Sequence, residues 1–408
     1  MKRIILLFVL FSTMAPMAFA ADNISLKWYG FVRSDFYINS RANEEAIDGV
    51  LHLYPKPIVL DGTGKDINAV PQAEMLSVAT RLGLDIQGTK LFGATSTAKI
   101  EFDFAGTGAL FFLVQLRQAY VQLLWENDAL LVGQTWHPMF GSVFPTGVSF
   151  NSGSPFQPFN RSPQIRYAHQ FGENFSLMGA ALYQMQYTSN GPNGFSASYM
   201  KNSLTPNLHV NLEYNNKGII AGVGLDYKRI KPDAKSISSL SIVGYGQYTK
   251  SLLQIKAKAI VGQNLADYTM PGGYAKVLPF MNDSFDHTWA NMKNLNTWVN
   301  VVYGKQWQVG LFAGFMQNLG LGNSWANLHD FGSGYTIYGR GFYAASQEIL
   351  DRLVRVAPMV IYNLNNLQVG LEYNLTGANY GVIGSNGRAT NPYTVTNHRL
   401  LASVVYSF

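Results

Sequence analysis

The stretch LQVGLEYNL, residues 367–375, alternates between apolar side chains and polar or small ones. The apolar set consists of Leu367, Val369, Leu371, Tyr373 and Leu375. Because successive side chains of a β-strand point to opposite faces, this period of two predicts a strand with one apolar and one wet face. Its length is about the nine to eleven residues that a tilted strand needs to cross a bilayer.

The same alternation recurs in NLHVNLEY (207–214), LLQIKAKAIV (252–261) and NFSLMGAALYQMQY (174–187). Short turns and long loops alternate between such segments, as they do in outer-membrane barrels. The predicted strands are 28–40, 76–88, 94–105, 113–125, 129–137, 164–171, 175–189, 207–215, 218–230, 238–249, 252–267, 292–303, 306–318, 352–363, 366–377 and 393–408. The long loops are 41–75, 138–163, 190–206, 268–291, 319–351 and 378–392. We therefore predict an all-β protein, a transmembrane antiparallel up-and-down β-barrel of about 16 strands.

Composition agrees with this fold and excludes others. Charged residues are 13% of the chain and aromatic residues 13%, with a mean hydropathy of +0.01. About a quarter of an average soluble protein is charged. No segment after residue 20 approaches the twenty apolar residues of a transmembrane helix. The chain has no cysteine, so it has no disulfides, and no basic block indicates nucleic-acid binding.

The first twenty residues have the pattern of a secretory signal peptide. Lys2 and Arg3 precede an apolar run over residues 4–11, and Ala18-Phe19-Ala20 supplies a cleavage site. An N-terminal membrane anchor is the alternative, but the apolar run is too short to span a bilayer. We expect residues 1–20 to be the signal peptide and 21–408 the barrel domain, with the mature chain beginning at Ala21.

The chain ends on another alternating stretch, HRLLASVVYSF (398–408). In a barrel this last strand pairs with the first, because open sheet edges carry unpaired backbone groups that hydrocarbon does not tolerate. A terminal strand that ends in Phe also resembles the recognition signal of bacterial outer-membrane proteins. By that resemblance, Phe408 would be read by the outer-membrane assembly machinery.

Charged residues fall on the inward face of the predicted strands. The pore-lining candidates are Arg33, Arg81, Arg117, Arg166, Arg355, Arg399, Glu101 and Asp103. Over all the predicted strands, ten basic and seven acidic residues point inward. These side chains either solvate a wet lumen or form a constriction that favours anions, for which the planar fork of Arg is suited.

The loop over 138–163 is rich in proline and aromatic residues. It holds Phe140, Phe144, Phe150, Phe156 and Phe159, together with Arg161. Five phenylalanines in a loop should pack against something. Because this loop follows the fifth predicted strand, it is the third connection on the long-loop side, and it resembles the loop that forms the eyelet of general porins. We predict that it folds into the barrel and constricts the pore. Packing on a neighbouring loop or subunit is the alternative.

The segment LRQAYVQLLW (116–125) departs from clean alternation. With Arg117 inward, Gln118 and Gln122 would point outward, which favours contact with another subunit and hence a homotrimer. A position on the periplasmic side or a local bulge is the alternative interpretation.

Three motifs resemble one family. LRQAYVQL (116–123), LLVGQTWHPMF (130–140) and the opening WYGFVRSDFYINS (28–40), together with the terminal Phe, resemble the trimeric DcaP-like porins. These motifs cover about a tenth of the chain. The resemblance implies an outer-membrane trimer in which Arg117 and the loop after Trp136 belong to the constriction.

No catalytic or metal-binding signature is present. The sequence lacks G-x-S-x-G, a P-loop and metal-ligand spacing of its seven histidines, so we expect no enzyme activity, cofactor or metal. The predicted function is an outer-membrane porin for passive diffusion of small hydrophilic solutes, with mild anion selectivity. A substrate-specific channel and a barrel-anchored surface adhesin that uses loops 41–75 and 319–351 are the alternatives.

Overall fold

The structure is a computed structural model that describes residues 24–47, 50–106, 113–150, 153–184, 186–278, 287–322 and 335–408. The predicted signal peptide, residues 1–20, lies outside the described residues.

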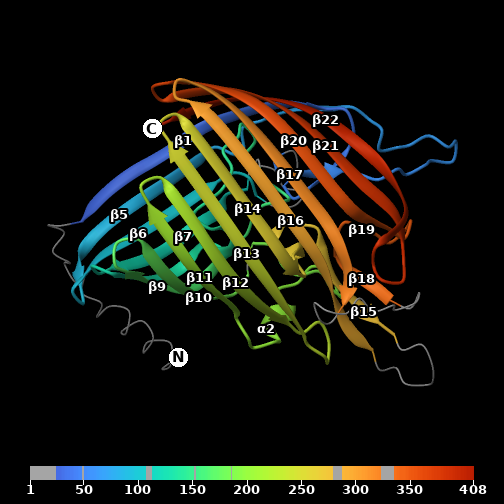
Figure 1. Cartoon of the computed structure of the whole chain (residues 1–408), viewed down its shortest axis with the longest axis horizontal. Coiled ribbons are helices and arrows are strands. Elements are labelled where there is room, and N and C mark those ends of the chain that lie inside the picture. The colour runs from blue at the N-terminus through green and yellow to red at the C-terminus, as the bar shows by residue number, and fades with distance from the viewer. Residues whose placement is uncertain are drawn as a thin grey trace, which may run out of the picture.

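Within the described residues, sixteen antiparallel strands form a closed up-and-down barrel (Figure 1). They are β1 (Ser25–Asn39), β5 (Arg81–Leu91), β6 (Ala94–Asp103), β7 (Gln115–Leu124), β8 (Asp128–Trp136), β9 (Arg161–Phe171), β10 (Phe175–Leu182), β11 (Asn207–Asn216), β12 (Ile219–Ile230), β13 (Ile237–Lys250), β14 (Leu253–Gln263), β16 (Thr288–Gly304), β17 (Trp307–Gly322), β20 (Glu348–Leu364), β21 (Leu367–Ile383) and β22 (Ala389–Ser407). The predicted fold class and strand number are confirmed.

Shorter elements lie near the barrel's long-loop end and inside it. The strands are β2 (Asn43–Glu45), β3 (His52–Pro55), β4 (Gln72–Leu76), β15 (Gly272–Val277), β18 (Tyr335–Arg340) and β19 (Phe342–Tyr343), and the helical turns are η2 (Pro138–Phe140), α2 (Ser198–Lys201) and η3 (Ala266–Tyr268). No helix among the described residues has the length and apolar character needed to cross a membrane.

The last strand closes the barrel on the first. β1 and β22 pair from Phe31 opposite Ser407 to Asn39 opposite Arg399. Beyond this ladder, the Gly30 N–H donates to the Phe408 carbonyl at 3.1 Å, and the Phe408 N–H donates to the Gly30 carbonyl at 3.0 Å. The ladder therefore leaves no open edge between the two ends of the sheet.

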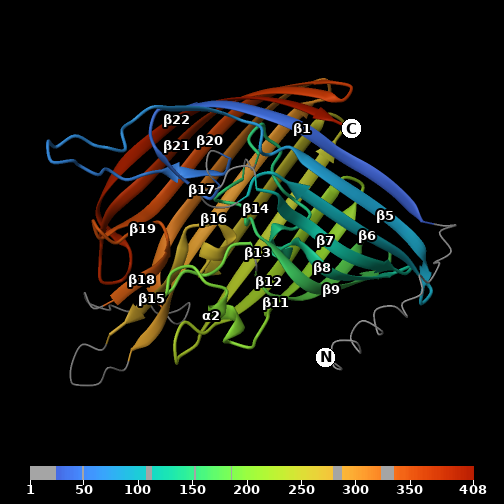
Figure 2. The same ribbon diagram turned by 180° about the vertical axis from the view of Figure 1, so that it is seen from behind.

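The two ends of the barrel differ. Tight turns gather at the end where the C-terminus lies, and the blue segment between β1 and β5 projects beyond the opposite, long-loop end (Figures 1 and 2). One tight turn has Lys217 and Gly218 at φ 44° and 88°, which matches the positive φ values of a two-residue hairpin turn.

Two predictions depart most from the observed strand bounds. Most of the predicted loop 378–392 is strand, because β21 and β22 continue their pairing past Tyr380 opposite Tyr393. Conversely, the predicted strand 175–189 is too long. β10 ends at Leu182, which is the last residue to pair with both β9, at Gln164, and β11, at Asn207.

The outer surface is apolar. Along β21 the outward Leu371 is 46% exposed, whereas its inward neighbour Glu372 is 2% exposed. Exposed aromatic side chains recur where strands approach the short-turn end, namely Trp28, Phe171, Phe175, Tyr248, Tyr303, Trp307, Tyr406 and Phe408. An apolar band with an aromatic girdle is the surface that a membrane barrel presents to lipid.

Candidate functional site

The loop between β8 and β9, residues 137–160, crosses the barrel interior. On the far wall, the N–H groups of Val148 and Ser149 donate to Glu372 Oε2 at 3.0 and 3.2 Å. Arg33 Nη2 donates to the Val148 carbonyl at 2.6 Å, and the Thr146 N–H donates to Asn300 Oδ1 at 2.8 Å. The loop thus reaches β1, β16 and β21, and it narrows the lumen.

Two inward glycines give this loop room against the wall. A Cβ on Gly314 of β17 would lie 2.5 Å from the Phe156 ring, and one on Gly370 of β21 would lie 2.8 Å from the Val148 side chain. Trp298 Nε1 fixes the same stretch by donating to Gln157 Oε1 at 3.0 Å. The loop is therefore packed against the barrel wall as well as hydrogen-bonded to it.

His137 anchors the start of the loop. Its Nδ1 accepts a hydrogen bond from the Met139 N–H at 3.2 Å, and its Nε2 lies 3.6 Å from Asp226 Oδ1. Burial lowers the pKa of His137 to about 3, so the ring is neutral at ordinary pH. Lys258 of β14 donates to the carbonyls of Phe140 and Met139. The first turn of the loop is thereby tied to two strands.

A cavity of about 580 Å³ remains between the loop and the wall formed by β1, β5, β7, β8, β9, β20 and β21. Four predicted arginines line it, namely Arg33, Arg81, Arg117 and Arg166. Four of the predicted phenylalanines line it too, namely Phe140, Phe144, Phe150 and Phe159. None of the described residues lining this cavity is acidic.

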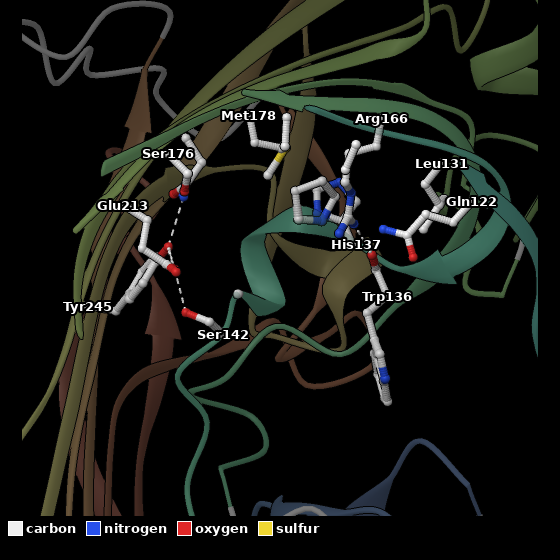
Figure 3. Close-up of a pocket in the computed structure, with 15 residues that line it drawn as sticks. Gln122, Leu131, Trp136, His137, Ser142, Arg166, Ser176, Met178, Glu213 and Tyr245 are labelled. Atoms are coloured by element: carbon white, nitrogen blue, oxygen red, sulfur yellow. Dashed lines mark hydrogen bonds between the residues drawn. The ribbon is translucent and has the colours of Figure 1, made fainter. Parts of the chain in front are cut away.

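A second cavity of about 360 Å³ shares Trp136, Gly141 and Arg166 with the first. Figure 3 shows Arg166 on one side of this space and Glu213 on the other. Glu213 accepts hydrogen bonds from Tyr245 Oη at 2.7 Å and Ser142 Oγ at 2.5 Å. The Glu213 carboxylate is thus hydrogen-bonded by neutral donors, while Arg166 lines both cavities.

The other acidic candidates are paired beneath the arginines. Arg117 donates to Glu101 Oε1 at 2.8 Å and to Asp103 Oδ2 at 2.6 Å, and both carboxylates are buried. Arg81 lies 3.8 Å from Glu101.

Arg166 differs from Arg117 in its partners. It donates to Gln164 Oε1 and to the Trp136 carbonyl, each at 2.8 Å. Among the described residues it has no carboxylate partner. Its charge is therefore less compensated than that of Arg117.

The remaining basic and aromatic candidates do not line the 580 Å³ cavity. Arg355 is buried and donates to the carbonyls of Ser154 and Leu53. Arg399 is buried, with its guanidinium 3.8 Å from the centre of the Tyr37 ring. Arg161 lies against the rings of Trp136 and Phe159, and Phe156 is buried against Gly314.

Sequence reasoning did not single out Trp136, which lines the cavities, or Lys256, which holds the loop. Trp136 lines both cavities and stacks on Phe140, with ring centres 4.2 Å apart. Lys256 of β14 donates to Thr146 Oγ1 at 3.0 Å and so fixes the loop from the opposite wall. The alternation along β14 indicates that Lys256 points inward. Nothing in the sequence indicates that it contacts the loop.

The outward prediction for Gln118 and Gln122 is wrong. Glu101 pairs with Gln118 and Phe102 with Leu116, so Arg117 is the extra residue of a β-bulge. Arg117 and Gln118 therefore both face inward, and Thr135 Oγ1 donates to Gln118 Oε1 at 2.9 Å. Gln122 lines the 360 Å³ cavity. These residues give no support to a subunit contact.

Similarity to known proteins is found in structure. No protein-family model matches the chain, and no curated protein matches its sequence. The outer membrane channel DcaP of Acinetobacter baumannii superposes with a TM-score of 0.68 at 18% identity, over 95% of this chain and 98% of that one. The chain has the fold of a porin. The predicted resemblance to the DcaP-like porins is thus confirmed at the level of the fold.

Two further structures share this fold at lower similarity. The anion-selective porin from Comamonas acidovorans and the trimer form of OmpT from Vibrio cholerae each give a TM-score of 0.53 at 11% identity. Each alignment covers 95% of this chain and 100% of the other.

Proposed function

We propose that this protein is an outer-membrane porin, a non-enzymatic water-filled channel through which small hydrophilic solutes diffuse passively, with a mild preference for anions. The apolar outer surface suits lipid, and the lumen keeps open space beside the inward loop. The observation that carries the anion preference is the 580 Å³ cavity, lined by four arginines and by no described acid.

The preference should be modest. Two unit charges about 4 Å apart interact by roughly 1 kcal/mol in bulk water and about 4 kcal/mol at an effective dielectric constant of 20. A wet channel lies toward the lower value, and physiological salt screens charges over about 8 Å. The carboxylates of Glu101 and Asp103 beneath Arg117 offset part of the field. Permeability ratios of several-fold follow, without exclusion of cations.

The assembly is proposed to be a homotrimer in the outer membrane. The support is the shared fold with a porin solved as a trimer, together with the apolar band that places the barrel in lipid. Phe408 at the end of the closing strand is proposed to be read by the outer-membrane assembly machinery.

Planar bilayers test the channel directly. Purified protein should give stepwise conductance, and its reversal potential in a KCl gradient should indicate that Cl⁻ permeates more readily than K⁺. A conductance blocked by one solute at low concentration would favour a substrate-specific channel. Folded protein without conductance would refute the porin proposal and favour a barrel-anchored adhesin.

A further inference from the structure

The 360 Å³ cavity, which we call the side cavity, carries one charge of each sign on opposite sides (Figure 3). Among the described residues that line it, Arg166 of β9 is the only permanent cation and Glu213 of β11 is the only acid. His137 also lines the side cavity, but its ring is neutral, as described above. The side cavity thus differs from the 580 Å³ cavity, whose described lining holds arginines and no acid.

Both charged groups keep free hydrogen-bonding capacity. The two hydrogen bonds that Glu213 accepts fall on Oε2, so Oε1 has no partner among the described residues. Arg166 donates through Nε and Nη2, so its Nη1 is left without one. Lys258 lies over the ring of Tyr245, but it donates to carbonyls of the constriction loop and forms no described ion pair with Glu213. A cation could therefore bind at Glu213 and an anion at Arg166.

Neutral polar groups lie beside the two charges. Ser176 of β10 pairs with Glu213, and Leu131 of β8 pairs with both Gln122 and Arg166. The side chains of Gln122 and Ser176 are partly exposed and form no hydrogen bond with the described residues. Because each side chain can both donate and accept, the two suit the N–H and carbonyl groups of a peptide bond.

The two charges are far apart along the wall. Arg166 lies opposite Ala180 of β10. Glu213 lies opposite Ser176 of the same strand, nearer the short-turn end. With about 3.3 Å per residue and about 4.8 Å between strands, the backbone positions of Arg166 and Glu213 are roughly 16 Å apart.

The two side chains cover part of this distance, and a solute that touches both must span the rest. A single α-amino acid is too short, since one carbon atom separates its charged groups. Two or three extended residues span roughly 7–11 Å. A volume of about 360 Å³ also lies in the range of small-molecule sites.

We propose that the side cavity binds short peptides of two or three residues with free termini, with the ammonium group at Glu213 and the carboxylate at Arg166. This inference rests on the proposed function, because the solute must reach the cavity through an open lumen. Both contacts are charge-assisted hydrogen bonds. A dianion would place a carboxylate against Glu213 and a diamine would place an ammonium against Arg166, so like charges reject both.

The test uses the full chain in planar bilayers, where a solute that binds in the lumen interrupts the KCl current. The frequency and duration of the interruptions give its affinity. The probes are trialanine, N-acetyltrialanine without the ammonium, trialanine amide without the carboxylate, and alanine.

Three variants are compared. Glu213→Gln removes the acid, and its amide oxygen can still accept the hydrogen bonds from Tyr245 and Ser142. Arg166→Gln removes the cation. Glu173→Gln is the matched control, because this acid is exposed in the turn between β9 and β10. Heat-sensitive mobility on gels confirms that each variant is folded.

Trialanine should bind at least five-fold more tightly than the other three probes, since one ion pair in a wet lumen is worth about a five-fold change in affinity. Glu213→Gln should weaken trialanine about five-fold and leave N-acetyltrialanine unchanged. Arg166→Gln should weaken both of these peptides and leave trialanine amide unchanged, and Glu173→Gln should change nothing.

Equal affinities for trialanine and alanine, or an equal effect of Glu213→Gln on the free and the acetylated peptide, would overturn the proposal. A persistent KCl current that trialanine does not interrupt would overturn it while leaving the porin proposal intact. Folded protein without any KCl current would refute both.

Discussion

If the channel prefers anions as proposed, Arg166 is one side chain that would set this preference. It faces both cavities, and its described hydrogen-bond partners are the neutral Gln164 side chain and the Trp136 carbonyl. Arg117, in contrast, is held by two carboxylates at 2.8 Å and 2.6 Å. An anion near Arg166 therefore meets a field that no adjacent carboxylate cancels.

We predict that Arg166→Gln lowers the Cl⁻/K⁺ permeability ratio by about two- to five-fold, the effect of up to roughly 1 kcal/mol in a wet channel. Reversal potentials in a KCl gradient measure this ratio. Arg352→Gln is the matched control, because it removes the same charge from the outward face of β20. An unchanged ratio would mean that Arg33 and Arg81 set the selectivity.

Alternation in the sequence predicted which way most charged side chains face, but not what covers them. Arg33, Arg81 and Arg166 line the cavity, whereas Arg355 has the same inward direction and lies buried under the loop. Alternation also failed at Gln118, because the bulge at Arg117 shifts the register by one residue. A bulge leaves no mark in a pattern of apolar and polar residues.

At the scale of elements, the constriction loop is held mostly through its backbone. Glu372, Arg33 and Arg355 all bond to its N–H or carbonyl groups, so the loop sequence itself carries little trace of these contacts. Its phenylalanines did predict packing inside the barrel. Which rings line the cavity and which are buried depends on wall positions such as Gly314, which are distant in sequence.

We predict that Gly314→Val reduces single-channel conductance. The new side chain would occupy the place of the Phe156 ring, whose nearest atom lies 2.5 Å from the Cβ position. The loop must then move away from β17 and toward the cavity. Gly244→Val on β13 is the matched control, because nothing lies within 4 Å of its Cβ position. Equal conductance in both variants would show that the loop is not seated on β17.

At the scale of the whole molecule, the period of two along the strands was sufficient to predict the closed barrel. The sequence gives a weaker indication of how several barrels would assemble. On the outer surface, Ser34 of β1 contacts Ser77, their hydroxyl oxygens 2.8 Å apart. Apolar Val32 and Phe36 flank Ser34 on the same outward face and are exposed. A polar pair in an apolar band is a candidate subunit contact that does not depend on the glutamines of β7.

We predict that Ser34→Trp weakens the homotrimer, because a large ring at a packed interface forces the subunits apart. Facing lipid, the same ring would be tolerated. Light scattering in mild detergent and unheated gel electrophoresis measure the assembly. Ala221→Trp on the outward face of β12 is the control. Stable trimers of Ser34→Trp would show that the interface lies elsewhere. A monomeric unmodified protein would refute the proposed homotrimer.

Phe408, at the end of β22, takes part in closing the barrel and is proposed to be recognised by the assembly machinery. Backbone bonds between Gly30 and Phe408 complete the closing ladder, and these bonds do not need the Phe408 ring. We therefore predict that Phe408→Ala, refolded from urea into detergent, still closes into a barrel with heat-sensitive mobility.

In cells, the same variant should reach the outer membrane in lower amounts, because the assembly machinery would no longer recognise its C-terminus. Quantitative blotting of outer-membrane fractions measures this, with Tyr406→Ala, another exposed aromatic of β22, as the control. Normal amounts in cells would refute recognition through Phe408, whereas failure to refold in detergent would assign the ring to closure of the barrel.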